Sequence, residues 1–218
     1  MCTIFFLLYT RPLFAEEDLM CIDDSYESKI ENYISGYYLK EEEKLYQSMI
    51  KEVSMCKTKN NEIVYHKFCR TDKLCLSSLR RYAASIFKYA IEFDLDPWLL
   101  AAVSLNESNY DAFTVGGVGE KGIFQLHPKS PWGKKSKFVS DKRYNKLCKS
   151  RIGHCQWEVI GIASETLRAH LDIFKRQERA LTVYNTGKAL PIRKTYVNAV
   201  MNKRRRLLNG NKEISRCD

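Results

Sequence analysis

The sequence predicts an all-α fold, because apolar residues recur at helical spacing along most of the chain and no convincing strand-like alternation interrupts them. Of the 218 residues, 44% are hydrophobic and 28% are charged, so the chain carries enough apolar material for a sizeable core. Its length suits one domain with an appendage, or two small domains. We therefore expect a helical domain that follows an N-terminal helical extension.

The predicted extension covers residues 16–75. Residues 26–56 carry an apolar stripe at helical spacing, which a charged run at residues 40–44 interrupts. Residues 57–75 are polar and contain cysteines, which is typical of a connector. The stripe consists of Ile30, Ile34, Tyr37, Leu45, Met49 and Val53.

The predicted main domain covers residues 76–207, and a C-terminal tail follows at residues 208–218. Asp96 and Pro97 start a helix, with Asp96 as the N-cap and Pro97 at the first helical position, where its missing N–H costs nothing. Residues 111–122 hold four of the ten glycines, which predicts a loop.

The second half of the domain is predicted to begin with a basic, irregular segment at residues 127–156. Helices are expected to resume at Glu158, and a shorter helix is expected to end near Gly187, a suitable residue after a helix C-terminus. The last helix contains Tyr196 and runs into the basic residues 203–206, which suit the negative end of a helix dipole.

Glu107 is the most informative residue, because it occupies a position at which the helix should be apolar. Val103 lies one helical turn earlier and Leu100 two turns earlier, and both are expected to face the core. Apolar surroundings and the negative end of the helix would both raise the pKa of this carboxyl group. A carboxylic acid that stays protonated near neutral pH can act as a general acid. The alternative is a glutamate at the helix end that is rotated into solvent.

Two later segments supply the polar and aromatic groups that a sugar-binding site needs. Residues 119–126 combine glycines, which let the backbone approach a ligand closely, with the amide of Gln125. Residues 180–187 bring together the phenol of Tyr184 and the amide of Asn185 before a glycine. Amides can bind N-acetyl groups, and aromatic rings can lie against sugar faces.

These residues resemble three ordered motifs of the soluble lytic transglycosylase catalytic domain, which belongs to the lysozyme-like superfamily. The resemblance covers roughly residues 76–205, and it includes a later Tyr-Val segment at Tyr196-Val197. Each motif alone is weakly specific, whereas the ordered set is strong. The motifs are Glu107-Ser108, then Gly119, Gly122 and Gln125 in Gly-x-x-Gly-x-x-Gln, then Ala180, Tyr184, Asn185 and Gly187 in Ala-x-x-x-Tyr-Asn-x-Gly.

The resemblance implies cleavage of the β-1,4 bond between N-acetylmuramic acid and N-acetylglucosamine in peptidoglycan, with 1,6-anhydro ends as the product. It implies that Glu107 is the single catalytic residue, acting first as acid and then as base, with no cofactor and no metal. It implies that five further residues bind the glycan strand of the substrate. One of them, Ser108, is also expected to brace the turn that carries Glu107. These substrate-binding residues are Ser108, Gln125, Tyr184, Asn185 and Tyr196.

Two alternatives stay open at this point. A lysozyme-type hydrolase (muramidase) normally uses two carboxylates; Asp111 and Glu120 lie nearby in sequence, but neither is an evident partner of Glu107, and Glu120 is expected to face solvent. The chain could also be an inactive, cell-wall-binding scaffold of a secretion system or virion. A nucleic-acid partner is possible on the net charge of +10 alone, but no nucleic-acid-binding motif accompanies it.

The N-terminus and the cysteines indicate export. Residues 1–15 resemble a secretory signal peptide, although a buried N-terminal strand or helix is the alternative, and the apolar run at residues 2–9 is far shorter than the ~20 residues of a membrane span. We expect a periplasmic, secreted or virion-associated protein with envelope or virion assembly partners.

Eight cysteines favour an oxidising compartment, and two pairs are close enough in sequence to close small disulfide loops. Zinc is the alternative, because a histidine lies beside each pair, but the spacings match no tight zinc signature. Loss of residues 1–15 would leave one of three other cysteines unpaired or paired with another chain. The close pairs are Cys69 with Cys75 and Cys148 with Cys155, and the three others are Cys21, Cys56 and Cys217.

Overall fold

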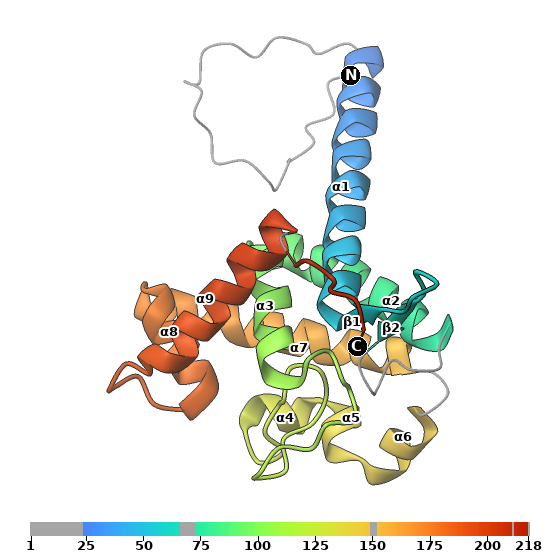
Figure 1. Cartoon of the computed structure of the whole chain (residues 1–218). Coiled ribbons are helices and arrows are strands. Elements are labelled where there is room, and N and C mark those ends of the chain that lie inside the picture. The colour runs from blue at the N-terminus through green and yellow to red at the C-terminus, as the bar shows by residue number, and fades with distance from the viewer. Residues whose placement is uncertain (1–23, 66–72, 149–151, 211, 218) are drawn as a thin grey trace. The chain divides into compact units, whose positions relative to one another are not determined.

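The described residues are mostly helical, as predicted. The computed structural model of the protein (Figure 1) describes residues 24–65, 73–148, 152–210 and 212–217. The chain divides into two compact units, residues 1–39 and residues 40–218. The division falls inside helix α1 (Asp24–Val53), whereas the sequence predicts a boundary near residue 75. The predicted signal peptide, residues 1–15, lies outside the described residues.

The last four turns of α1 belong to the second unit and are part of its core. Leu45, Met49 and Val53 of the predicted stripe are almost fully buried there. Among the described residues, no helix is both long enough and apolar enough to cross a membrane.

A small hairpin follows α1 and corrects the prediction of helix to residue 56 and of a plain connector after it. Strand β1 (Ser54–Lys57) pairs antiparallel with β2 (Ile63–Tyr65), and strands this short show too little alternation to be predicted. The C-terminal tail lies along β1, since the Lys57 N–H donates to the Ser215 carbonyl at 2.8 Å. A disulfide between Cys56 and Cys217 closes this contact, and Cys69 and the side chain of Cys75 lie outside the described residues.

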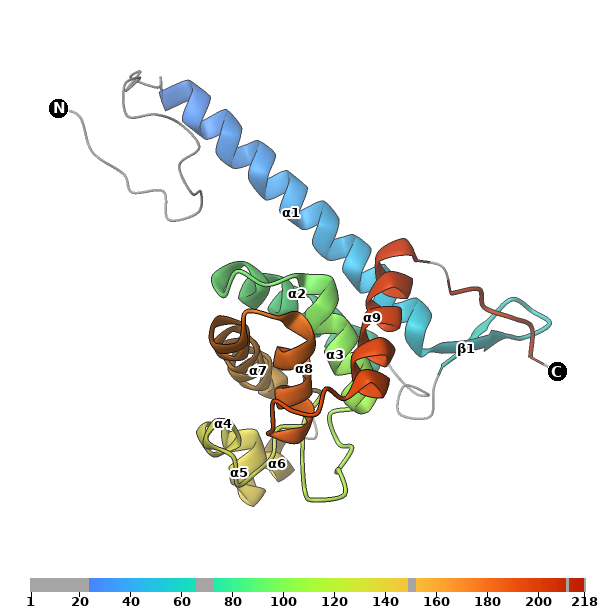
Figure 2. The same cartoon turned by 90° about the vertical axis from the view of Figure 1, so that its left-hand side faces the viewer.

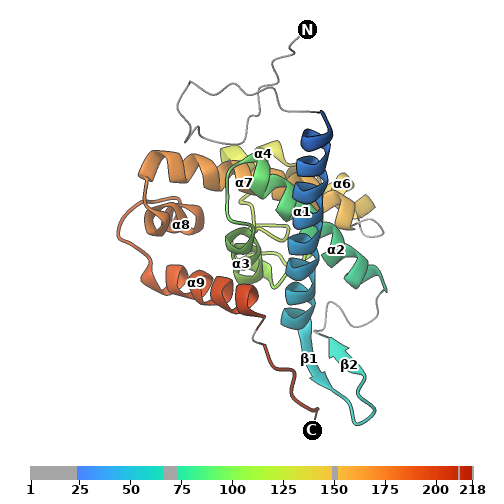
Figure 3. The same cartoon turned by 90° about the horizontal axis from the view of Figure 1, so that it is seen from above.

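The core is built around three helices, α2 (Lys73–Glu92), α3 (Pro97–Ser108) and α7 (Ile152–Phe174). Helix α2 packs against α7 and α3, and α3 also packs against α9 (Lys194–Asn209), as Figures 2 and 3 show. Every side chain of α3 from Trp98 to Leu105 is buried. A helix that is apolar on all sides must lie inside the domain, and this position is what places Glu107 at the end of a rigid element.

The basic segment after the glycines is more ordered than the sequence predicts. It forms three short helices, α4 (Pro131–Lys135), α5 (Lys137–Ser140) and α6 (Lys142–Leu147), and α7 then begins at Ile152 rather than at Glu158. Each short helix is capped by a polar side chain, from Ser130, Ser136 and Asp141 respectively. Helices of four to six residues carry no measurable apolar period, which is why the pattern did not reveal them.

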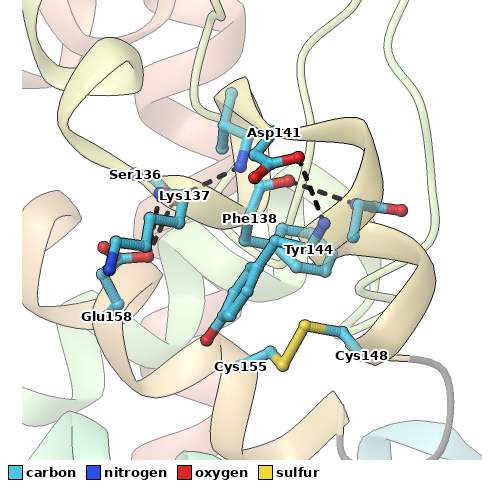
Figure 4. Close-up of a disulfide and its surroundings, with 10 residues drawn as sticks. Ser136, Lys137, Phe138, Asp141, Tyr144, Cys148, Cys155 and Glu158 are labelled. Carbon is cyan, nitrogen blue, oxygen red and sulfur yellow. Dashed lines mark hydrogen bonds between the residues drawn. A yellow bond between two sulfur atoms is a disulfide. The ribbon is translucent and has the colours of Figure 1, made fainter.

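The short helices are tied to α7 at two points (Figure 4). The predicted Cys148–Cys155 disulfide joins the end of α6 to the first turn of α7. One turn further along α7, the Glu158 carboxylate accepts a hydrogen bond from the Lys137 N–H at 3.1 Å. The segment is therefore fastened to α7 at its middle, through Lys137, and at its C-terminal end, through Cys148.

Helices α8 (Gln177–Thr186) and α9 complete the domain. Gly187 ends α8 in the left-handed conformation, with φ 70°, as predicted. The basic residues of α9 make specific contacts with other elements, and their predicted interaction with the helix dipole stays a prediction. Lys203 Nζ donates to Asn106 Oδ1 at 2.9 Å, Arg204 pairs with Asp96, and Arg206 pairs with Glu52.

Candidate active site

Helix α3 presents Glu107 in its last turn. The Asp96 side chain accepts a hydrogen bond from the Trp98 N–H at 2.9 Å, which fixes the first turn as predicted. Asn109 ends the helix with φ 52°, so the chain turns away directly after Ser108. Glu107 is half-buried, facing the partners described below, and the alternative of a glutamate rotated into solvent is not what the structure shows.

The carboxyl group of Glu107 is poised between its two protonation states. Its pKa is raised to about 7, and burial is the main cause. The hydrogen bond from the Tyr196 hydroxyl lowers the pKa, the charge of Glu120 raises it, and the charge of Arg193 lowers it. The Tyr196 hydroxyl donates to Glu107 Oε1 at 2.5 Å. The predicted direction and its main cause, the apolar surroundings, are confirmed. A carboxyl group with a pKa near neutrality can both donate and accept a proton at ordinary pH.

One wall of the site is the glycine loop, residues 111–126. Its C-terminal part is held by side chains of α3 and α7. From α3, the hydroxyls of Ser104 and Ser108 donate to the Ile123 carbonyl at 3.1 and 2.9 Å. On the other side, the Ile123 N–H donates to Gln156 Oε1 of α7 at 2.9 Å. Ser108 is 6% exposed and braces the turn beside Glu107, while its direct contact with substrate stays a prediction.

Gly122 shows why this loop needs glycine. Its φ is +80°, and a Cβ there would stand 2.9 Å from Gln156 Oε1 and 3.0 Å from a methyl group of Val159. The backbone therefore packs directly against α7, in a conformation that L side chains rarely adopt.

Gln125 lies in the same loop, and both of its amide hydrogens are used within it. Nε2 donates to the carbonyls of Thr114 and Gly122, at 3.0 and 2.9 Å. An amide side chain can offer both a donor and an acceptor to a ligand. The structure leaves the carbonyl oxygen as the available group.

Glu120 is the clearest departure from the sequence-based expectation. It is half-buried instead of facing solvent, and its Oε2 accepts a hydrogen bond from the Val118 N–H at 3.1 Å. A Cβ on Gly116 would stand 2.3 Å from this Oε2 and 2.9 Å from Gln125 Oε1, so the two side chains are neighbours. The carboxylate is close enough to Glu107 to raise its pKa.

The other predicted residues come from α8 and α9. The Tyr184 hydroxyl donates to the Phe124 carbonyl at 2.9 Å, which connects α8 with the glycine loop. Burial and the charge of Glu107 both raise the pKa of Tyr184, which therefore stays protonated. Asn185 Oδ1 is buried and has no hydrogen-bond partner among the described residues. The structure thus gathers Tyr184 and Tyr196 around Glu107, with Gln125 in the adjoining loop.

Sequence reasoning missed one residue that acts on Glu107, namely Arg193. It lies one residue before the first turn of α9, and its charge lowers the pKa of both Glu107 and Tyr196. Arg193 precedes Tyr196 by three residues, which places both on the same face of the helix, and this spacing could have indicated its role. Within the described parts of the chain, no group of three or more metal-ligating side chains is present.

Comparison with known proteins supports the resemblance. Residues 84–206, more than half of the chain, match the transglycosylase SLT domain. No match is found among curated proteins or among solved structures. Since proteins with this domain degrade peptidoglycan as lytic transglycosylases, the match supports an activity of that general type. The chain therefore belongs to the transglycosylase SLT domain family of the lysozyme-like superfamily.

Proposed function

We propose that the protein is a peptidoglycan lytic transglycosylase that cleaves the β-1,4 bond between N-acetylmuramic acid and N-acetylglucosamine and leaves 1,6-anhydro ends. The observation that carries the proposal is the state of Glu107: a carboxyl group with a pKa of about 7, held by the Tyr196 hydroxyl at the end of a buried helix. The family match supports the same substrate.

The proposed reaction uses this one carboxyl group twice. Protonated Glu107 gives its proton to the glycosidic oxygen as the bond from that oxygen to C1 breaks. The N-acetyl group of the substrate stabilises the positive charge that develops at C1. The Glu107 carboxylate then takes the proton of the C6 hydroxyl, whose oxygen closes on C1, so that Glu107 ends protonated and no water is consumed. A pKa near the working pH serves both steps.

The neighbouring residues have two proposed roles. Tyr196 and Tyr184 orient Glu107 and the loop beside it, since their hydroxyls are already bound to Glu107 Oε1 and to the Phe124 carbonyl. Asn185 and Gln125 contact the N-acetyl groups of the substrate. For Asn185 the support is its unpaired Oδ1, because a buried carbonyl oxygen without a donor gains from binding a substrate N–H.

The site of action is proposed to lie outside the cytoplasm, where peptidoglycan is found. The disulfides Cys56–Cys217 and Cys148–Cys155 support an oxidising compartment. Export by residues 1–15 and association with envelope or virion components stay predictions.

The experiment is mass spectrometry of the fragments released from purified peptidoglycan by the full chain, with Glu107→Gln as the control. We expect 1,6-anhydro ends with the wild type and no release with the variant. Equal release by both proteins would assign the acid to another residue. A wild type that binds peptidoglycan but releases nothing would favour an inactive wall-binding scaffold.

A muramidase is the second candidate, because one observation favours it. Glu120 is a second carboxylate close enough to influence Glu107, and hydrolysing glycosidases normally use a pair. Fragments with reducing ends would support this candidate, and their loss in Glu120→Gln would assign the second carboxylate.

A further inference from the structure

The α8–α9 segment, residues 186–195, comprises the end of α8, the connection and the start of α9, and it lines an open hollow of about 500 Å³. Its apolar part consists of Leu190, Pro191 and Ile192, and Leu190 is 61% exposed. No aromatic residue is among those that line it, so the hollow lacks the flat rings against which sugar faces pack.

The rim of the hollow is cationic. Lys188, Arg193 and Lys194 line it together with no acidic residue. None of these three cations forms a salt bridge within the part of the chain that the structure describes. Three unpaired cations around an apolar floor suit a ligand that carries both carboxylates and small apolar groups.

The hollow adjoins the candidate active site at both of its ends. Thr186, at its start, follows Tyr184 and Asn185 directly at the end of α8. Arg193, at its end, lies one turn before Tyr196 and is close enough to Glu107 to lower its pKa. The hollow is therefore within reach of a substituent on a sugar that is bound at Glu107.

We propose that this hollow binds the peptide stem of the glycan strand, with the stem carboxylates at Lys188 and Lys194 and its alanyl side chains on the apolar floor. This inference rests on the proposed function, because it concerns the same substrate. The lactyl group of N-acetylmuramic acid carries the stem, which combines alanine methyl groups with free carboxylates and so matches both parts of the hollow. The enzyme then favours glycan that carries charged stems.

The test changes the charge of the peptide stems and keeps their length constant. One batch of peptidoglycan is divided, and the stem carboxylates of one half are amidated with carbodiimide and ammonia, which leaves the glycan and the stems in place. Fragment release at low substrate concentration is measured for the wild type and for Lys188→Gln/Lys194→Gln. Arg193 is kept, so that the surroundings of Glu107 do not change. The charge-matched control is Lys142→Gln/Lys146→Gln, at two exposed positions of α6.

We expect amidation to slow the wild type and the α6 control about fivefold, the effect of two exposed ion pairs. The double variant should be about fivefold slower on untreated material, and amidation should slow it little further. The proposal would be overturned if the wild type cleaved both materials equally fast. It would also be overturned if amidation slowed the double variant by the same factor as the wild type. A wild type that releases nothing from untreated peptidoglycan would instead contradict the proposed function.

Discussion

The glycine loop and the α8–α9 segment both adjoin Glu107, yet they are constructed in opposite ways. In the loop, the Ile123 peptide is bound by side chains of α3 and α7, and Gly122 packs against α7 without room for a Cβ. In the segment, Lys188, Leu190 and Lys194 are exposed, and Gly187 has no atom within 4 Å of the Cβ it lacks. The first wall can hold the reacting groups in place, whereas the second can adapt to a ligand.

The largest expected effect comes from the carboxyl group between the two walls. Glu107→Gln should reduce the rate of glycan cleavage about 10³-fold or more, because it removes the acid and the base together. The measurement is the initial rate on soluble glycan strands. The fold control is thermal unfolding at pH 5, where Glu107 is protonated and an amide is a close replacement. A residual rate within tenfold of the wild type would remove Glu107 from the reaction.

Two glycine substitutions compare the walls directly, because both residues have positive φ. Gly122→Ala should cost about 2–5 kcal/mol of unfolding free energy, from left-handed strain and from overlap with Gln156 and Val159. Gly187→Ala has φ 70° but open space around it, so it should cost about 1 kcal/mol. Denaturant unfolding with the disulfides intact measures both. Equal losses would mean that the loop is not held as tightly as its contacts indicate.

A smaller effect is expected where α8 meets the substrate. Asn185→Ala should lower kcat/KM about tenfold, the value of one hydrogen bond to a substrate N–H. Asn198→Ala, at an exposed position of α9, is the matched control and should leave the rate unchanged. If the two variants behave alike, the unpaired Oδ1 has no role in binding.

The smallest effects are shifts of the pH profile, and a residue of the glycine loop and a residue of α9 should produce them in opposite directions. The charge of Glu120 raises the pKa of Glu107, so Glu120→Gln should lower that pKa and move the alkaline limb of kcat/KM to lower pH. The hydrogen bond from Tyr196 lowers the pKa, so Tyr196→Phe should raise it and move the limb to higher pH. Shifts of the same sign in both variants would contradict this assignment.

The sequence predicted the features that depend on local chemistry. The Asp96 cap with Pro97, the end of α8 at Gly187 and the inward position of Glu107 are all confirmed, because each follows from a few neighbouring residues. The order of the three motifs was sufficient to identify the family.

What the sequence could not predict depends on contacts between distant or very short segments. The Cys56–Cys217 disulfide joins residues 161 positions apart, and nothing local specifies that pairing. The two strands are too short to show a period. The Glu120 carboxylate accepts a hydrogen bond from the Val118 N–H, a contact that a loop sequence does not reveal.

The most direct test of the central claim is cleavage of peptidoglycan in water enriched in ¹⁸O, followed by mass spectrometry of the new sugar ends. If Glu107 takes the proton of the C6 hydroxyl, the new end is a 1,6-anhydro sugar, lighter than the hydrolysis product by one water and free of ¹⁸O. If the new ends carry ¹⁸O, water is the acceptor. Glu107 then works with a second group such as Glu120, and the single-carboxylate mechanism is wrong.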